Sequence, residues 1–168
     1  MVRSKIIVTG HTSGIGKHLY ENLDGIVIGA SRSNGRPIKE ISQWFDESCD
    51  IFINNAYDDE GMTFQSDALK YVYSKWKNDS SKMIISIGSN APDWNTDDNY
   101  SEGKRLLDKT NFKYFMESIG VKCSLIRPGW TDTPRITELW DGKKLKVDRI
   151  LEVVNFIINL VFMLILPI

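Results

Sequence analysis

The residue types that bind metals or form disulfides are scarce in this chain, which has two cysteines and two histidines among 168 residues. Cys49 and Cys123 each lie beside an apolar segment, and His11 and His18 lie in a different part of the chain. Cysteines placed in this way are typical of buried, reduced thiols and not of a disulfide framework. We therefore expect neither a disulfide nor a metal site.

The chain also lacks an excess of charge of one sign, because its 21 lysines and arginines nearly balance its 22 aspartates and glutamates. Such a balance gives no general attraction to nucleic acid or to an anionic membrane, so we expect a small molecule or another protein as the partner. Arg3 and Lys5 run into an apolar strand pattern without the longer apolar core and cleavage site of a signal peptide. This pattern predicts a cytoplasmic protein.

One long apolar run is present, from Ile150 to Ile168, and its length would allow it to span a bilayer. Glu152, Asn155 and Asn159 interrupt the run at intervals that place them on one stripe of a helix. This pattern favours an amphipathic helix packed on the core, followed by a buried strand, over a membrane anchor.

Apolar runs alternate with segments of helical spacing along the chain. The apolar runs predict strands at Lys5–Thr9, Gly25–Ala30, Asp50–Asn54, Lys82–Ile87, Val121–Arg127 and Val161–Leu166. The helical spacing predicts helices at Gly14–Leu23, Ile38–Glu47, Ser66–Lys77, Ser101–Ile119 and Asp148–Leu160. Alternation of this kind indicates a parallel sheet covered by helices on both faces. We therefore predict one doubly wound α/β domain over residues 1–168.

The stretch VTGHTSGIGK, from Val8 to Lys17, has three glycines where the first strand becomes a helix. Gly10 would allow a sharp turn, Gly14 would let the backbone approach a diphosphate, and Gly16 would let the helix pack closely on the sheet. The free N–H groups at the start of the helix would then point at an anion.

Five stretches together resemble the short-chain dehydrogenase/reductase family. These are TGxxxGxG at 9–16, an NNA motif at 54–56, a strand-end serine at Ser89, YxxxK at 100–104 and PGxxxT at 128–133. The resemblance covers residues 5 to about 135 and implies a Rossmann-like NAD(P)-binding domain. It implies cofactor contacts from Gly10, Thr12, Ser13, Gly14, Ile15, Gly16, Ser31, Arg32, Asn55, Ala56, Tyr100, Lys104, Pro128, Gly129, Thr131 and Thr133.

The residues after the second predicted strand bear on the choice of cofactor. An enzyme that prefers NAD places an acidic residue there to bind the ribose hydroxyls, whereas this chain has Ser31 and Arg32. A guanidinium can bind a phosphate through two parallel hydrogen bonds. We therefore predict NADP (NADPH) as the cofactor, with Arg36 and His11 as weaker candidates for the same pocket.

Tyr100 and Lys104 share one face of a predicted helix, which would bring the ammonium close to the phenol. By resemblance, Tyr100 is the catalytic acid and base, Lys104 tunes it and holds the nicotinamide ribose, and Ser89 binds the substrate oxygen. A neighbouring cation favours the phenolate form of a tyrosine. The resemblance thus implies an oxidoreductase that interconverts a small-molecule carbonyl and a secondary alcohol.

The chain departs from the family pattern in several places. It is short, so the third strand is either reduced to a few residues near Arg36–Ile38 or lost, and the substrate lid is minimal. Tyr57 replaces the glycine of the NNAG motif, and Gln65 is the candidate substitute for a missing relay asparagine.

These departures leave two other functions open: a non-catalytic NADP-binding sensor or assembly subunit, and an isomerase or dehydratase on the same fold. The family resemblance also implies a homodimer or homotetramer formed through the helices at 66–77 and 101–119.

Overall fold

The computed structural model describes residues 3–94, 98–137 and 141–163. A parallel sheet of five strands lies at its centre, in the order β2-β1-β3-β4-β5. The strands are β1 (Lys5–Thr9), β2 (Ile26–Ala30), β3 (Ile51–Asn54), β4 (Met83–Ile87) and β5 (Lys122–Ile126). The predicted α/β class with a parallel sheet is therefore confirmed.

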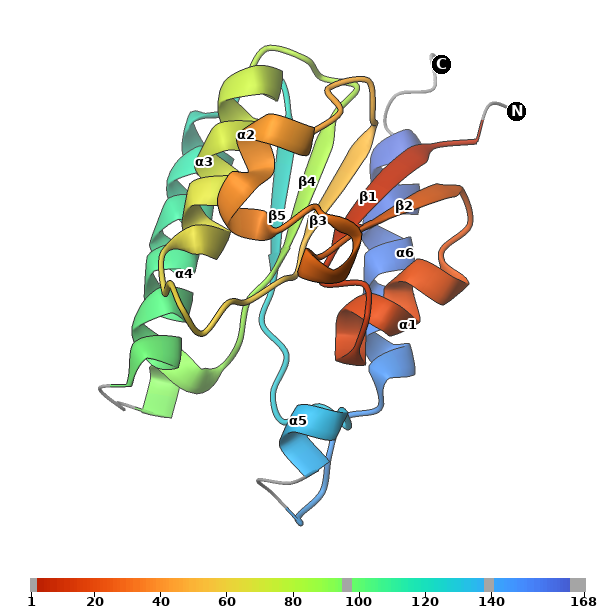
Figure 1. Ribbon diagram of the computed structural model, residues 1–168. Coiled ribbons are helices and arrows are strands. Elements are labelled where there is room, and N and C mark those ends of the chain that lie inside the picture. Colours follow the sequence, from red (N-terminus) through yellow and green to blue (C-terminus); the bar gives the residue numbers. More distant parts are fainter. Residues whose placement is uncertain (1–2, 95–97, 138–140, 164–168) are drawn as a thin grey trace.

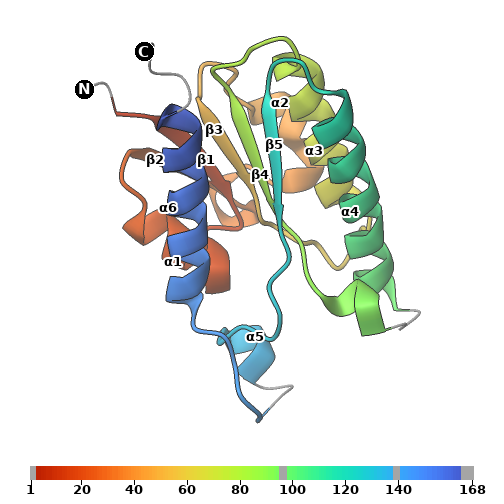
Figure 2. The same cartoon turned by 180° about the vertical axis from the view of Figure 1, so that it is seen from behind.

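Helices cover both faces of the sheet (Figures 1 and 2). One face carries α1 (Gly14–Asn22) and α6 (Val147–Met163), and the other carries α2 (Ile41–Trp44), α3 (Phe64–Trp76) and α4 (Asn99–Glu117). The short helix α5 (Pro134–Thr137) lies beyond the carboxyl ends of the strands. This arrangement places the segment after β5 over the edge of the sheet where ligands bind in doubly wound folds.

The core consists of two apolar layers, one on each face of the sheet, because successive strand side chains point to opposite faces. Ile7 and Phe52 belong to the layer under α3 and α4, and Val8 and Ile53 belong to the layer under α1 and α6. The continuous apolar runs of β3 and β4 therefore mark strands that are buried on both faces, whereas β2 and β5 at the sheet edges are only partly buried. Both cysteines are buried free thiols, as expected.

Of the two alternatives for the third strand, a few residues near Arg36–Ile38 or its complete loss, the structure shows the loss. The segment after β2 instead forms two short 3-10 helices, η1 (Arg32–Asn34) and η2 (Ile38–Glu40), which lead into α2. Pro37 cannot donate a backbone hydrogen bond to a sheet, and its carbonyl accepts one from the indole of Trp44 at 2.8 Å. The single helix predicted at Ile38–Glu47 is thus shorter and begins as a 3-10 turn.

The strand predicted at Val161–Leu166 is wrong over its first residues, because α6 continues to Met163. Leu164 to Leu166 lie outside the described residues. Periodicity cannot tell a short continuous apolar run in a strand from one in a buried helix, which explains the error. Among the described residues, none of the helices combines the length and the hydropathy that a bilayer crossing requires.

Thr9, the last residue of β1, fixes the loop that follows β3. Its hydroxyl donates to the carbonyl of Ile53 at 3.2 Å and accepts hydrogen bonds from the backbone N–H groups of Asn55 and Ala56, each at 2.9 Å. The amide of Asn55 in turn donates to the Thr9 carbonyl at 3.0 Å. The carboxyl ends of β1 and β3 are therefore held together directly below the glycine turn.

We expect Thr9→Val to lower the free energy of unfolding by about 1–3 kcal/mol, because the partly buried N–H groups of Asn55 and Ala56 lose their acceptor. Thr9→Ser keeps the hydroxyl and should lose less than half as much. Urea denaturation followed by circular dichroism measures both values. Equal losses in the two variants would contradict the role given to the hydroxyl.

Candidate functional site

The turn between β1 and α1 has the backbone shape that its glycines were expected to allow. Gly10 and Gly14 have φ values of +70° and +54°, which lie in the left-handed region that favours glycine. A Cβ atom on Gly16 would lie 2.2 Å from the carbonyl oxygen of Gly10 and 2.5 Å from the side-chain nitrogen of Asn55. Gly16 therefore permits a close contact of the helix with the strand ends, as the sequence indicated.

The N-terminus of α1 is suited to hold an anion. Ser13 is its N-cap, yet the Ser13 side chain makes no capping hydrogen bond, and the first turn contains no acidic residue. The first backbone N–H groups of a helix, together with its dipole, attract a negatively charged group. Ser13, Gly14 and Ile15 line the cavity described below, whereas Thr12 is exposed beside it.

The segment after β5 covers this turn. Thr133 lies over Gly14, since a Cβ atom on Gly14 would be 3.4 Å from a methyl carbon of Thr133. The Thr131 hydroxyl donates to the Gly129 carbonyl at 3.0 Å, and Thr131 is paired with Leu145 through an isolated bridge. Backbone contacts therefore hold the cover in place.

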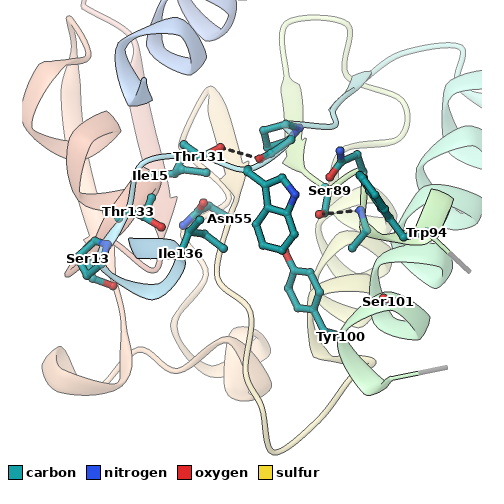
Figure 3. A pocket seen from close by; sticks show the side chains of 18 of the residues that line it. Ser13, Ile15, Asn55, Ser89, Trp94, Tyr100, Ser101, Thr131, Thr133 and Ile136 are labelled. Atoms are coloured by element: carbon teal, nitrogen blue, oxygen red, sulfur yellow. Dashed lines mark hydrogen bonds between the residues drawn. The ribbon is translucent and has the colours of Figure 1, made fainter. Parts of the chain in front are cut away.

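A cavity of about 470 Å³ opens between the glycine turn, this cover and the start of α4. Figure 3 shows Ser13, Ile15, Thr133 and Ile136 on one side of it, and Ser89, Trp94, Tyr100 and Ser101 on the other. The Tyr100 ring points from α4 into the space between the two sides. Of the predicted site residues, the cavity is lined by Ser13, Gly14, Ile15, Asn55, Ser89, Tyr100, Pro128, Gly129, Thr131 and Thr133.

Lys104 lies one helical turn after Tyr100 and is almost completely buried, with 3% of its surface exposed. Its Nζ atom lies 5.4 Å from the centre of the Tyr100 ring. The ammonium donates to the side-chain oxygen of Gln65 at 2.8 Å and to the carbonyl of Ile87, at the end of β4, at 3.0 Å. The predicted pair of Tyr100 and Lys104 is therefore brought together beside the cavity.

Gln65 is itself fixed by three strand-end contacts. Its amide nitrogen donates to the carbonyls of Asn54 and Ile87 at 2.8 and 3.0 Å. The side chain of Asn54 donates back to the Gln65 carbonyl at 2.9 Å. Gln65 thus connects the ends of β3 and β4 to the buried ammonium of Lys104. These contacts leave the ammonium little freedom to move.

Tyr57, which replaces a glycine of the family motif, packs against the same group. Its ring meets the Tyr100 ring edge to face, with 4.9 Å between their centres, and the Lys104 ammonium lies 5.8 Å from the centre of the Tyr57 ring. Both rings are within the range in which a cation is attracted to an aromatic face. The substitution therefore adds a wall to the site that restrains Tyr100.

Ser89 lies at the end of β4 in a loop held by Arg127. The Ser89 hydroxyl accepts a hydrogen bond from the backbone N–H of Ala91 at 3.1 Å, and the Arg127 guanidinium donates to the Ser89 carbonyl, also at 3.1 Å. Arg127 also donates to Asp93 at 2.6 Å, which raises the pKa of Arg127, and forms an ion pair with Asp108 at 3.1 Å. Burial raises the pKa of Asp108 in spite of this pair.

Several predicted cofactor residues lie outside the cavity. Gly10 and Gly16 belong to the glycine turn itself, and Ala56 packs against it, since a Cβ atom on Gly10 would be 3.1 Å from the Cα atom of Ala56. Ser31 and Arg32 follow β2 at a different point of the same sheet edge. Lys104 does not line the cavity but lies next to Tyr100, which does.

The loop after β2 engages the Ser31 hydroxyl in local hydrogen bonds and leaves the Arg32 side chain exposed. The Ser31 hydroxyl lies 2.9 Å from that of Ser33, and the Ser31 backbone N–H donates to Asn34 at 3.0 Å. The Arg32 side chain is 69% exposed, and its guanidinium lies 3.8 Å from the buried carboxylate of Asp58. The guanidinium is therefore available to a ligand, whereas the serine hydroxyl supports the loop.

Sequence reasoning missed nine residues that line the cavity, namely Gly88, Asn90, Ala91, Trp94, Asp98, Ser101, Trp130, Pro134 and Ile136. It also gave no role to Arg127, which anchors the loop of Ser89. The position of Trp130 directly after the PG motif was an available signal. The ion pairs of Arg127 with Asp108 and Asp93 join residues 19 and 34 positions apart and have no local pattern.

Comparison with solved structures identifies the fold as that of the short-chain dehydrogenases/reductases. A short-chain dehydrogenase from Burkholderia cenocepacia in complex with NADP superposes with a TM-score of 0.68 at 19% identity, over 87% of this chain and 80% of that one. A 3-ketoacyl-(acyl-carrier-protein) reductase from Brucella melitensis complexed with NADH superposes with a TM-score of 0.64 at 14% identity. The match covers 91% of this chain and 89% of that one.

A third such structure, a short-chain dehydrogenase/reductase from Burkholderia phymatum in complex with NAD, gives a TM-score of 0.57 at 15% identity, over 79% of this chain and 67% of that one. No protein-family model and no curated protein sequence matches the chain. The likeness therefore establishes the fold, which the five sequence motifs had indicated.

We expect Gln65→Leu to lower the free energy of unfolding by about 3–5 kcal/mol, because it removes an acceptor from a buried ammonium and leaves strand-end carbonyls without their donor. Gln43→Leu, the same change on the exposed side of α2, should stay within about 0.5 kcal/mol of the parent. Chemical denaturation of both variants compares them. Similar values for the two would show that the buried amide does not stabilise the site.

Proposed function

We propose that this protein is an NADP(H)-dependent oxidoreductase that interconverts a carbonyl compound and a secondary alcohol. The observation that carries the proposal is the buried Lys104 ammonium placed 5.4 Å from the Tyr100 ring, beside a cavity that the glycine turn also lines. A tyrosine beside a fixed cation can release a proton to a reacting oxygen, because the cation stabilises the phenolate that remains.

The residues of the chain fit a dinucleotide. The glycine turn has no room for a Cβ atom at Gly16, and the N-terminus of α1 offers uncapped N–H groups to a diphosphate. Thr131, Thr133 and the Pro128-Gly129 turn would hold the nicotinamide end from above. A bound NADPH would supply the hydride.

The proposed proton transfer runs from Tyr100 to the substrate oxygen. During reduction the Tyr100 hydroxyl would give its proton to the carbonyl oxygen, while the Ser89 hydroxyl donates a hydrogen bond to the same oxygen and orients it. Lys104 would stabilise the resulting phenolate. In the reverse direction the phenolate would take the proton back from the alcohol.

We propose NADP over NAD because of the charge at the end of β2. Arg32 is exposed at the position where NAD-preferring enzymes carry a carboxylate, and a guanidinium there can pair with the 2′-phosphate of NADP. Asp58 is buried 3.8 Å from the guanidinium and would help to orient it.

We also propose that α4 takes part in self-association. Its outer face exposes Phe112, Phe115 and Met116, and Ile119 is exposed just after the helix ends. The helices α3 and α4 would carry the interface that the family resemblance implies.

Tyr100→Phe should lower kcat for carbonyl reduction by about 100-fold or more while NADPH still binds, because only the proton donor is lost. Tyr114→Phe changes a tyrosine on the same helix that stacks on Tyr73 away from the cavity, and it should keep full activity. NADPH consumption with a responsive ketone measures both. Unchanged turnover in Tyr100→Phe would overturn the proposal.

Arg32→Ala should weaken NADPH binding by about tenfold and leave NADH binding unchanged, because only NADPH carries the 2′-phosphate. Arg36→Ala, in the same loop, should have a much smaller effect. A titration that follows nicotinamide fluorescence gives the six dissociation constants, for the parent and the two variants with each nucleotide. An equal loss for NADPH and NADH in Arg32→Ala would contradict the assignment of the phosphate pocket.

A further inference from the structure

The tryptophans of this chain fall into two groups. Four of the five are described, and of these Trp44 and Trp76 pack in the core and donate their indole N–H groups to backbone carbonyls at 2.8 and 3.2 Å. Trp94 and Trp130 are instead 63% and 38% exposed, and both line the candidate active-site cavity. The two exposed indoles that the structure describes therefore border the same space.

Each of these indoles comes from a segment held close to the reacting groups. Trp94 ends the 3-10 helix η3 (Ala91–Trp94), which follows Ser89, and Figure 3 shows it on the side of the cavity that carries Tyr100. The backbone carbonyl of Trp130 accepts a hydrogen bond from the N–H of Leu145 at 2.7 Å. Exposed indole surface is costly in water, so the presence of two exposed indoles in the lining of one cavity points to an apolar ligand.

The charges around the cavity restrict that ligand further. Among the described lining residues, Asp98 is the only one whose side chain is charged at neutral pH, and it accepts hydrogen bonds from the backbone N–H and hydroxyl of Ser101 at 2.8 and 2.9 Å. Of the nearby arginines, Arg127 forms ion pairs with Asp93 and Asp108. Arg105 forms an ion pair with Glu102. The described lining thus offers no cation to a substrate carboxylate or phosphate.

We infer that the substrate of this site is a neutral aromatic ketone or aldehyde, or the matching alcohol, whose ring is contacted by the indoles of Trp94 and Trp130. This inference rests on the proposed oxidoreductase function and narrows it. Aromatic rings gain from offset or edge-to-face contact with an indole beyond the burial of apolar area. A carboxylate would instead lose hydration without gaining a partner and would face the charge of Asp98.

Two matched pairs of ketones test the inference. 2-Tetralone and 2-decalone share a bicyclic carbon skeleton but only the first has an aromatic ring, and acetophenone and benzoylformate differ in a carboxylate. We expect kcat/KM with NADPH to be about fivefold or more higher for 2-tetralone than for 2-decalone. We also expect acetophenone to be reduced much faster than benzoylformate.

Leucine variants identify the source of the preference. Trp130→Leu and Trp94→Leu keep an apolar side chain but remove the aromatic ring, so the ratio of 2-tetralone to 2-decalone should fall towards one. Phe156→Leu removes an exposed ring from α6, outside the cavity lining, and should leave the ratio unchanged. The dissociation constant for NADPH, measured on every variant, should stay within about twofold of the parent and shows that the site is folded.

Each remaining outcome is decisive. A ratio near one in the parent, a preference for benzoylformate, or a ratio that Trp130→Leu and Trp94→Leu leave unchanged would overturn the inference and leave the proposed reduction standing. If NADPH binds and no ketone is reduced, the proposed function fails instead. Calorimetric binding to the NADPH-loaded protein then decides the inference, which predicts tighter binding of 2-tetralone than of 2-decalone.

Discussion

The hydrogen bond from the Lys104 ammonium to the side chain of Gln65 is the contact on which the arrangement of the site depends. A charge with 3% exposure is stable only if acceptors surround it, and Gln65 supplies one of them at 2.8 Å. Because the Gln65 amide is bonded to the ends of β3 and β4, it fixes the ammonium to the sheet. The position of Tyr100, one turn before Lys104, follows from that anchor.

The other half of the cavity depends on close packing of backbone. Gly16 and Asn55 bring the start of α1 against the ends of β1 and β3, and the Thr9 hydroxyl holds the loop after β3 in place. Strand order places β1 and β3 side by side, so this contact lies at the point where the connections diverge to opposite sides of the sheet. A sheet of five strands therefore keeps a crevice at this point.

Local patterns were sufficient to predict the five strands of the sheet, the glycine turn and the pairing of Tyr100 with Lys104, because apolar runs and helical spacing are properties of neighbouring residues. The same patterns could not separate a strand from a helix at Val161, where a continuous apolar run suits both. Nor could they show that Gln65 meets Lys104, because 39 residues separate the two and only the fold joins them. Trp94 has no local signal for a ligand site either.

The central claim is that the protein transfers a hydride from NADPH to a ketone. The most direct test follows this hydride into the product alcohol. The protein would be incubated with NADPH carrying deuterium at both C4 positions and a neutral ketone, and the product alcohol analysed by mass spectrometry. Hydride transfer in the cavity predicts one deuterium on the carbinol carbon, in an amount that matches the NADPH consumed. Alcohol without deuterium, or bound NADPH that is never consumed with any ketone, would contradict the account.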